Sequence, residues 1–139
     1  MIELGVRSEE LGVNCQEWER EIMSIASEKS KRFAARIVRL YQYLHDQKRE
    51  YVMSRQLLRA GTSVGANLAE AEYSFSRNEF LAKTYIALKE VSETLYWLDL
   101  LKETDYLTVR EYKSIHSDAE ELRKMLSSIT KTTRSTPHS

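Results

Sequence analysis

The feature that most constrains the fold is that residues 66–136 contain neither glycine nor proline. The glycines and the single proline are Gly5, Gly12, Gly61, Gly65 and Pro137. Tight turns between strands depend on glycine, proline, asparagine and aspartate, whereas long helices do not. β-Branched residues, which favour strands, are also sparse. The chain is therefore predicted to be all-α.

Apolar residues recur at helical spacing over four segments of the chain. The longest stripe consists of Leu81, Leu88, Val91, Leu95, Leu98 and Leu101. Ser76–Glu79 and Thr108–Glu111 have the pattern of capping boxes, in which a hydroxyl and a carboxylate satisfy free amides of the first turn. We predict helices over residues 28–45, 54–72, 77–103 and 108–130. Short connections favour antiparallel neighbours, so the expected architecture is an up-down-up-down four-helix bundle over residues 27–130.

Residues 1–26 differ from the rest of the chain in charge, with six acids and two bases. We expect an acidic extension outside the bundle, either disordered or partly helical, with a short helix over residues 16–25. Met23 precedes the bundle and offers an alternative, namely that translation begins there. In both cases, deletion of residues 1–22 should leave folding and assembly intact. Residues 131–139 are rich in polar side chains and are expected to form a frayed tail.

Composition and motifs exclude several classes of protein. The chain has 139 residues, with 21 basic and 21 acidic side chains, which suits one domain with its own core. The lone Cys15 excludes a disulfide framework and a cysteine-based zinc site. No apolar run reaches the ~18 residues of a membrane span, so a cytoplasmic protein with no membrane partner is expected. Phosphate loops, nucleophile elbows and the Glu-x-x-His pairs of di-iron bundles are missing, so we expect no enzyme activity, metal or cofactor.

Basic residues are concentrated between positions 27 and 59, where nine bases accompany three acids. Such a cluster is typical of a phosphate-binding surface, although a solvated helix face gives the same pattern. Arg32, Arg36 and Arg39 are spaced by four and three residues and share one helical stripe. The candidate nucleic-acid-binding residues are Lys29, Lys31, Arg32, Arg36, Arg39, Arg55 and Arg59. The expected ligand is RNA or single-stranded DNA.

The helix predicted over residues 54–72 carries a polar line beside its apolar stripe. This line and two glutamates of the following helix are expected to form an inter-helix or inter-subunit polar network: Gln56, Ser63, Asn67, Glu70, Glu90 and Glu93. Gly61 and Gly65 cost helix stability, which indicates close packing, either within the monomer or between subunits. Tyr96 and Trp97 are adjacent and cannot both face one core, so one of them is expected at a boundary or interface.

The stretch from Gln56 to Ala71, with the sequence QLLRAGTSVGANLAEA, resembles the central motif of a bacterial four-helix-bundle family, the 23S rRNA intervening-sequence proteins. The segment over residues 80–98 agrees with the same family, in FLAK, IALKE and ETLYWL. The resemblance runs from about Phe33 to Leu126 and leaves residues 1–26 outside.

This resemblance implies an up-down bundle that assembles as a ring-like homopentamer. It also implies a fold shared with the accessory protein of diversity-generating retroelements, a relative that binds nucleic acid and a reverse transcriptase. No catalytic residues are carried over, and the neutral charge of this chain differs from the strongly basic relative. The first hypothesis is a non-enzymatic homo-oligomer that binds nucleic acid or a nucleoprotein partner such as a reverse transcriptase. The alternative is a structural or protein–protein interaction module without nucleic-acid binding.

Overall fold

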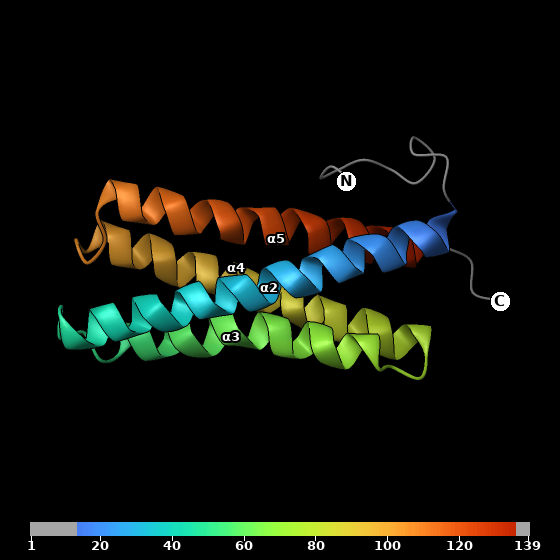
Figure 1. Cartoon of the computed structure of the whole chain (residues 1–139), viewed down its shortest axis with the longest axis horizontal. Coiled ribbons are helices and arrows are strands. Elements are labelled where there is room, and N and C mark those ends of the chain that lie inside the picture. The colour runs from blue at the N-terminus through green and yellow to red at the C-terminus, as the bar shows by residue number, and fades with distance from the viewer. Residues whose placement is uncertain (1–13, 136–139) are drawn as a thin grey trace.

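The computed structural model describes residues 14–135, and this part of the chain folds into four helices without a strand (Figure 1). The helices are α2 (Cys15–Asp46), α3 (Met53–Glu72), α4 (Arg77–Glu103) and α5 (Val109–Ser135). The predicted all-α class is confirmed, and the helix predicted over residues 77–103 matches α4 at both ends. None of the helices in the described range has a stretch long and apolar enough to cross a membrane.

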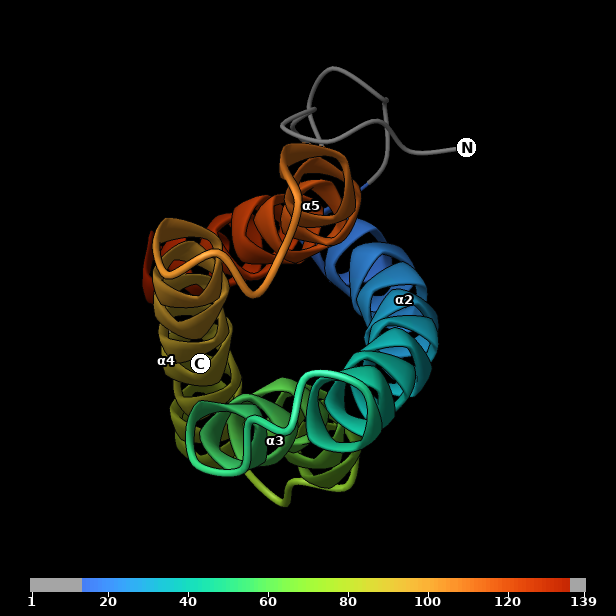
Figure 2. The same cartoon turned by 90° about the vertical axis from the view of Figure 1, so that its left-hand side faces the viewer.

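The helices are arranged in a ring in chain order. Each helix packs on its neighbours in sequence, and α5 closes the ring by packing on α2. Figure 1 shows that successive helices run in opposite directions, and Figure 2, viewed along the bundle, shows the closed ring. The up-down-up-down four-helix bundle is therefore confirmed, and the seam between α2 and α5 lies opposite the seam between α3 and α4.

The first helix begins well before its expected start at residue 28. α2 runs without a break from Cys15, and the side chain of Asn14 accepts a hydrogen bond from the Glu17 amide at 2.8 Å as its N-cap. Trp18 and Ile22, which fall within the expected acidic extension, are buried in the core. This corrects the boundary expected at residue 26 and the separate short helix. Apolar side chains at positions 18, 22, 26 and 33 continue the buried stripe of α2, and the negative charge lies on its other faces.

Met23 is a buried residue within α2, and translation from Met23 stays a prediction. A further correction concerns the C-terminal end of the chain. The tail expected from residue 131 is helical as far as Ser135, because α5 continues beyond the predicted end at residue 130. The first part of the proposed extension, residues 1–13, and the last four residues, 136–139, lie outside the described part of the chain.

Helix starts are fixed by local capping contacts. At α5 the Thr108 hydroxyl accepts from the Glu111 amide at 3.1 Å, and the Glu111 carboxylate accepts from the Thr108 amide at 2.8 Å, which confirms this capping box. At α4 the Ser76 hydroxyl accepts from the Glu79 amide as predicted, but the Glu79 carboxylate reaches the amide of Phe75 instead of that of Ser76. Both arrangements satisfy amides that lack partners within the helix.

Glu50 caps α3 in a way that no sequence pattern predicted. Its carboxylate accepts hydrogen bonds from the amides of Val52, Met53 and Ser54 at 3.1, 3.0 and 2.6 Å. Burial alone would raise the pKa of Glu50, but the hydrogen bonds to its charged form outweigh burial and hold the pKa below its usual value. A buried carboxylate therefore anchors the connection between α2 and α3.

Candidate nucleic-acid interface

Four of the seven candidate basic residues are held in ion pairs. On α2, Arg32 Nη1 lies 3.2 Å from Glu28, while Lys29 bridges to Glu121 of α5. Arg36 also reaches α5, with Nη1 2.6 Å from Asp118 Oδ2 and Nη2 2.8 Å from Ser114 Oγ. These guanidinium and ammonium groups are already partly neutralised, because each lies beside a carboxylate.

Arg59 of α3 lies on the opposite side of the bundle from Arg36. It pairs with Glu90 and Glu93 of α4, so it belongs to the seam between α3 and α4. The seven candidates therefore do not converge on one surface of the monomer. This corrects the expectation of a single basic surface, and the cause is the tertiary arrangement, which places the N-terminal half of α3 against α4.

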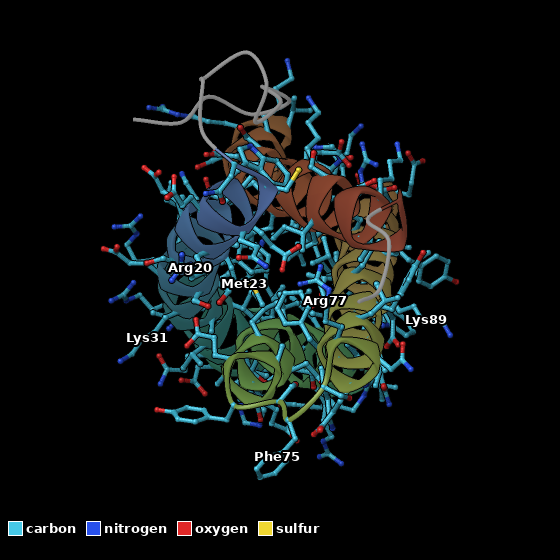
Figure 3. The ribbon with its side chains drawn as sticks, turned by 90° about the vertical axis from the view of Figure 1, so that its right-hand side faces the viewer. Arg20, Met23, Lys31, Phe75, Arg77 and Lys89 are labelled. Atoms are coloured by element: carbon cyan, nitrogen blue, oxygen red, sulfur yellow. The ribbon has the colours of Figure 1, made fainter. Side chains whose placement is uncertain are left out.

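Three candidates make no ion pair or hydrogen bond to any residue in the described range: Lys31, Arg39 and Arg55. All three are exposed. Lys31 points away from the bundle in Figure 3. Arg39 differs from the other two because it lines a groove, and its charge is therefore available to a ligand that enters there.

The groove lies on the seam between α2 and α5 and has a volume of about 460 Å³. Its α2 wall consists of Arg36, Arg39, Leu40 and Tyr43. The other wall comes from Leu107 and from Arg110, Glu111, Ser114 and Ile115 of α5. Apolar side chains form much of the surface, and arginines stand on both sides. The groove therefore offers a nucleotide an apolar surface for its base and positive charge for its phosphate.

Arg110 was missed by the sequence analysis. It is exposed, and it has no ion pair or hydrogen bond within the described residues. It lies 71 positions beyond Arg39 and in the part of the chain where acids outnumber bases. Only the packing of α5 on α2 brings the two arginines to the same groove. Its position in the first turn of a predicted helix was the one available signal, because anions favour helix N-termini.

The acidic residues near the groove limit its charge. Glu111 lines it as well, but its carboxylate caps the Thr108 amide. The charge of Arg36 is matched by Asp118. Arg39 and Arg110 thus face a single acid, and the groove is left with a modest positive charge. A ligand with one phosphate group matches this charge better than a densely charged one.

The predicted polar network divides into two kinds of contact. The glutamates make inter-helix contacts, with Glu70 accepting from Lys83 Nζ at 3.1 Å and Glu90 and Glu93 pairing with Arg59. The smaller polar side chains contact their own helix. Ser63 donates to the Arg59 carbonyl oxygen at 2.6 Å, Asn67 donates to the Ser63 carbonyl oxygen at 2.9 Å, and Gln56 accepts from Arg59 Nε at 3.3 Å.

Tyr96 and Trp97 occupy different environments, as their adjacency requires. Trp97 packs against the core, and its Nε1 donates to Glu93 Oε2 at 3.0 Å. Tyr96 is 58% exposed, and its ring forms a T-shaped contact with the Trp97 ring, with centroids 5.0 Å apart. Trp97 is thus the boundary residue that joins the core to the Arg59–Glu93 contact, and Tyr96 remains on the surface.

A second cavity, of about 590 Å³, lies at the opposite end of the bundle beside the α3–α4 turn. Arg77 forms two hydrogen bonds to Glu19 there, at 3.3 and 3.0 Å, and Met23 lines the same cavity. Figure 3 shows Arg77 and Met23 toward the interior, whereas Phe75 points outward. Two arginines and two glutamates line this cavity, so it has no net charge to select an anion.

No group of three His, Cys, Asp or Glu side chains within the described range is placed to hold a metal ion. His45 lies 2.9 Å from Asp46, and its ring contacts the rings of Tyr41 and Tyr51. His116 contacts the ring of Tyr112.

Comparison with known proteins places this fold and motif in one family. Residues 23–128 match the family described as 23S rRNA-intervening sequence protein. A crystal structure of a protein of unknown function from the S23 ribosomal protein family of Bacteroides thetaiotaomicron is 50% identical to this chain, with a TM-score of 0.78. It covers 79% of this chain and 98% of its own length. No functionally curated protein matches. The match over most of the chain, together with the bundle and its central motif, shows that the protein belongs to the 23S rRNA-intervening sequence protein family.

Proposed function

We propose that this protein is a non-enzymatic, homo-oligomeric bundle of the cytoplasm that binds RNA or single-stranded DNA through the groove between α2 and α5. The observation that supports this most strongly is the pair Arg39 and Arg110, which stand on opposite walls of one groove and have no carboxylate partner among residues 14–135. Arginine is suited to this role because its planar fork matches phosphate oxygens.

The homo-oligomeric part of the proposal is supported by apolar side chains outside the core. Ile86 and Tyr96 are exposed on α4, and Tyr73 and Phe75 are exposed at the α3–α4 turn, where Phe75 is 99% accessible. Large apolar side chains in such positions are typical of protein–protein contacts. A closed ring would repeat the groove in every subunit and so increase the affinity for a long strand.

The same exposed aromatic residues also favour the alternative, a protein–protein interaction module without nucleic-acid binding. The two functions differ in which surface they need. Nucleic-acid binding requires Arg39 and Arg110, whereas the alternative requires the α3–α4 turn and tolerates neutral residues in the groove.

The test is fluorescence anisotropy with a labelled single-stranded RNA, comparing the wild type with the Arg39→Gln/Arg110→Gln double variant. We expect a loss of at least about tenfold in affinity. The slope of the salt dependence should fall by about 0.7, because the two arginines share one phosphate and each phosphate contact to a single strand contributes about 0.7. The Arg20→Gln/Lys89→Gln variant, which removes two charges outside the groove, should bind as the wild type does. Equal binding by all three proteins, or none by the wild type at low salt, would favour the protein-interaction alternative.

Oligomerisation is tested separately by light scattering coupled to size exclusion. A mass of several subunits is expected at tens of micromolar, and five subunits would agree with the ring. A monomer at that concentration would contradict the homo-oligomer. The groove variants should keep the wild-type mass, which would show that their effect on RNA is not a consequence of lost assembly.

A further inference from the structure

We infer that the groove between α2 and α5 is a site for one unpaired nucleotide, with its phosphate between Arg39 and Arg110 and its base against Leu40, Tyr43 and Ile115. This inference rests on the proposed function and goes further, because it names the structural class of the nucleic acid. A base can enter the groove only when it is not paired, so the site should select single strands over duplexes.

The dimensions of the groove fit a small ligand and not a helix of nucleic acid. Its volume of about 460 Å³ lies within the range of about 300–1,000 Å³ that is usual for small-molecule sites. Immediately along the seam, the ion pairs Arg36–Asp118 and Lys29–Glu121 join α2 to α5. These pairs close the groove on that side, so its length is limited to the segment between Arg36 and the start of α5.

The polar groups of the groove are placed for one phosphate. Arg36 is engaged by Asp118 and Ser114, so it forms part of the wall, while Arg39 and Arg110 retain their donors. The Ser114 hydroxyl accepts from Arg36 and keeps its own proton for a ligand oxygen. Arg110 also lies in the first turn of α5, where the helix dipole favours an anion. Two arginines and a hydroxyl from two helices therefore line the same groove.

The apolar part of the groove is placed for a base. Tyr43 is partly buried against the core, and Leu40 and Ile115 lie on either side of the seam. Lys48 Nζ lies 5.9 Å from the centre of the Tyr43 ring, which adds a further positive charge near this wall. Aromatic side chains bind bases of any sequence by stacking, so little sequence preference is expected. The Glu111 carboxylate repels a second phosphate and can accept from a ribose hydroxyl or a base amino group.

The first experiment compares a labelled single-stranded RNA with the same RNA annealed to its complement. We expect the single strand to bind at least about tenfold more tightly. The Tyr43→Leu variant should lose between about fivefold and a hundredfold for the single strand, the range found when stacking side chains are removed, with little change for the duplex. Tyr43→Phe, which keeps the ring, should bind as the wild type does, and thermal unfolding checks that both variants fold.

The second experiment uses adenosine 5′-monophosphate and inorganic phosphate as probes, observed through the NMR methyl signals of Leu40 and Ile115. Adenosine 5′-monophosphate should shift both signals, phosphate should shift them much less, and Arg39→Gln/Arg110→Gln should abolish both effects. Compared with the RNA experiment, this measurement shows whether the groove binds a free nucleotide or a nucleotide within a strand.

The outcomes separate the two proposals. RNA binding with equal affinity for single strand and duplex, or without loss in Tyr43→Leu, overturns the unpaired-nucleotide site and leaves nucleic-acid binding intact. Shifts with adenosine 5′-monophosphate but no RNA binding overturn nucleic-acid binding and leave a site for a free nucleotide. If neither the RNAs nor adenosine 5′-monophosphate bind, both proposals are overturned.

Discussion

Gly61 of α3 lies directly against Ile37 of α2, so close that a Cβ at position 61 would stand 2.8 Å from both Cγ1 and Cγ2 of Ile37. Ile37 is fully buried and β-branched, so it cannot move aside by rotating. Gly65 of α3 faces Ser30 of α2, and a Cβ at position 65 would stand 3.2 Å from Ser30 Oγ. The close packing predicted for the two glycines is therefore present within the monomer, between α2 and α3.

Gly61→Ala is expected to destabilise the bundle by about 1–3 kcal/mol, the usual cost of overpacking a core. Gly65→Ala is the matched control. Both substitutions gain about 1 kcal/mol in helix propensity. The contact at position 65 is longer and involves a side-chain hydroxyl, so the stability of Gly65→Ala should be close to that of the wild type. Thermal and urea unfolding followed by circular dichroism would measure both. Equal stabilities of the two variants would contradict the difference in contact distance.

Deletion of residues 1–22 is expected to destabilise the protein, contrary to the sequence-based expectation. The deletion removes Trp18 and Ile22, both buried, and exposes the surface that they cover. Trp18→Ala alone should cost about 3–5 kcal/mol, which corresponds to a fall in melting temperature of about 10–15 °C for a chain of this length. Glu21→Ala, an exposed change in the same helix, should alter the melting temperature by less than about 2 °C. Unchanged stability of the deletion variant would indicate that residues 1–22 form an extension that does not pack in the bundle.

Glu50→Gln is expected to lower stability at neutral pH by about 1–2 kcal/mol, because the charged cap of α3 is lost. The pKa of Glu50 is held below its usual value in the folded state, so its contribution is fully present above the unfolded pKa and is lost as the pH falls through the folded pKa. The difference between wild type and variant should therefore shrink below about pH 4. Urea unfolding from pH 3 to pH 7 measures this, with exposed Glu21→Gln as the control. A difference that does not depend on pH would show that the charge of Glu50 is not what stabilises the turn.

Tyr112 is expected to ionise at a higher pH than an ordinary tyrosine. Its hydroxyl donates to Asp99 Oδ1 at 2.5 Å, and partial burial together with this hydrogen bond raises the pKa of Tyr112 to about 12. Its contribution to stability is present below the unfolded pKa and is lost as the pH rises toward 12. Ultraviolet titration should show one late step, which Tyr112→Phe removes and Asp99→Asn moves toward the usual value. A late step that survives in Tyr112→Phe would assign it to another tyrosine.

Much of the fold could be predicted because its signals are local. The Ser76 and Thr108 caps each lie within four residues of the groups that they satisfy, and the starts of α4 and α5 follow from them. The start of α2 was missed because acidic residues around Trp18 suggested a solvated extension. Trp18, Ile22 and Ala26 have helical spacing and continue the stripe of Phe33, so the signal for a longer helix was present in the sequence beside the acidic charge.

By itself, the sequence determined the helical class, the order and approximate bounds of the helices and the family, since periodicity, capping and a contiguous motif are properties of neighbouring residues. Only the tertiary structure decided which charges are available. Arg36 and Asp118 are 82 positions apart and lie 2.6 Å from each other, whereas Arg39, one turn later, meets Arg110 across an open groove. One helical turn changes the facing residue on the neighbouring helix, so the pairing of each charge depends on how α2 and α5 are aligned, and no local pattern encodes that alignment.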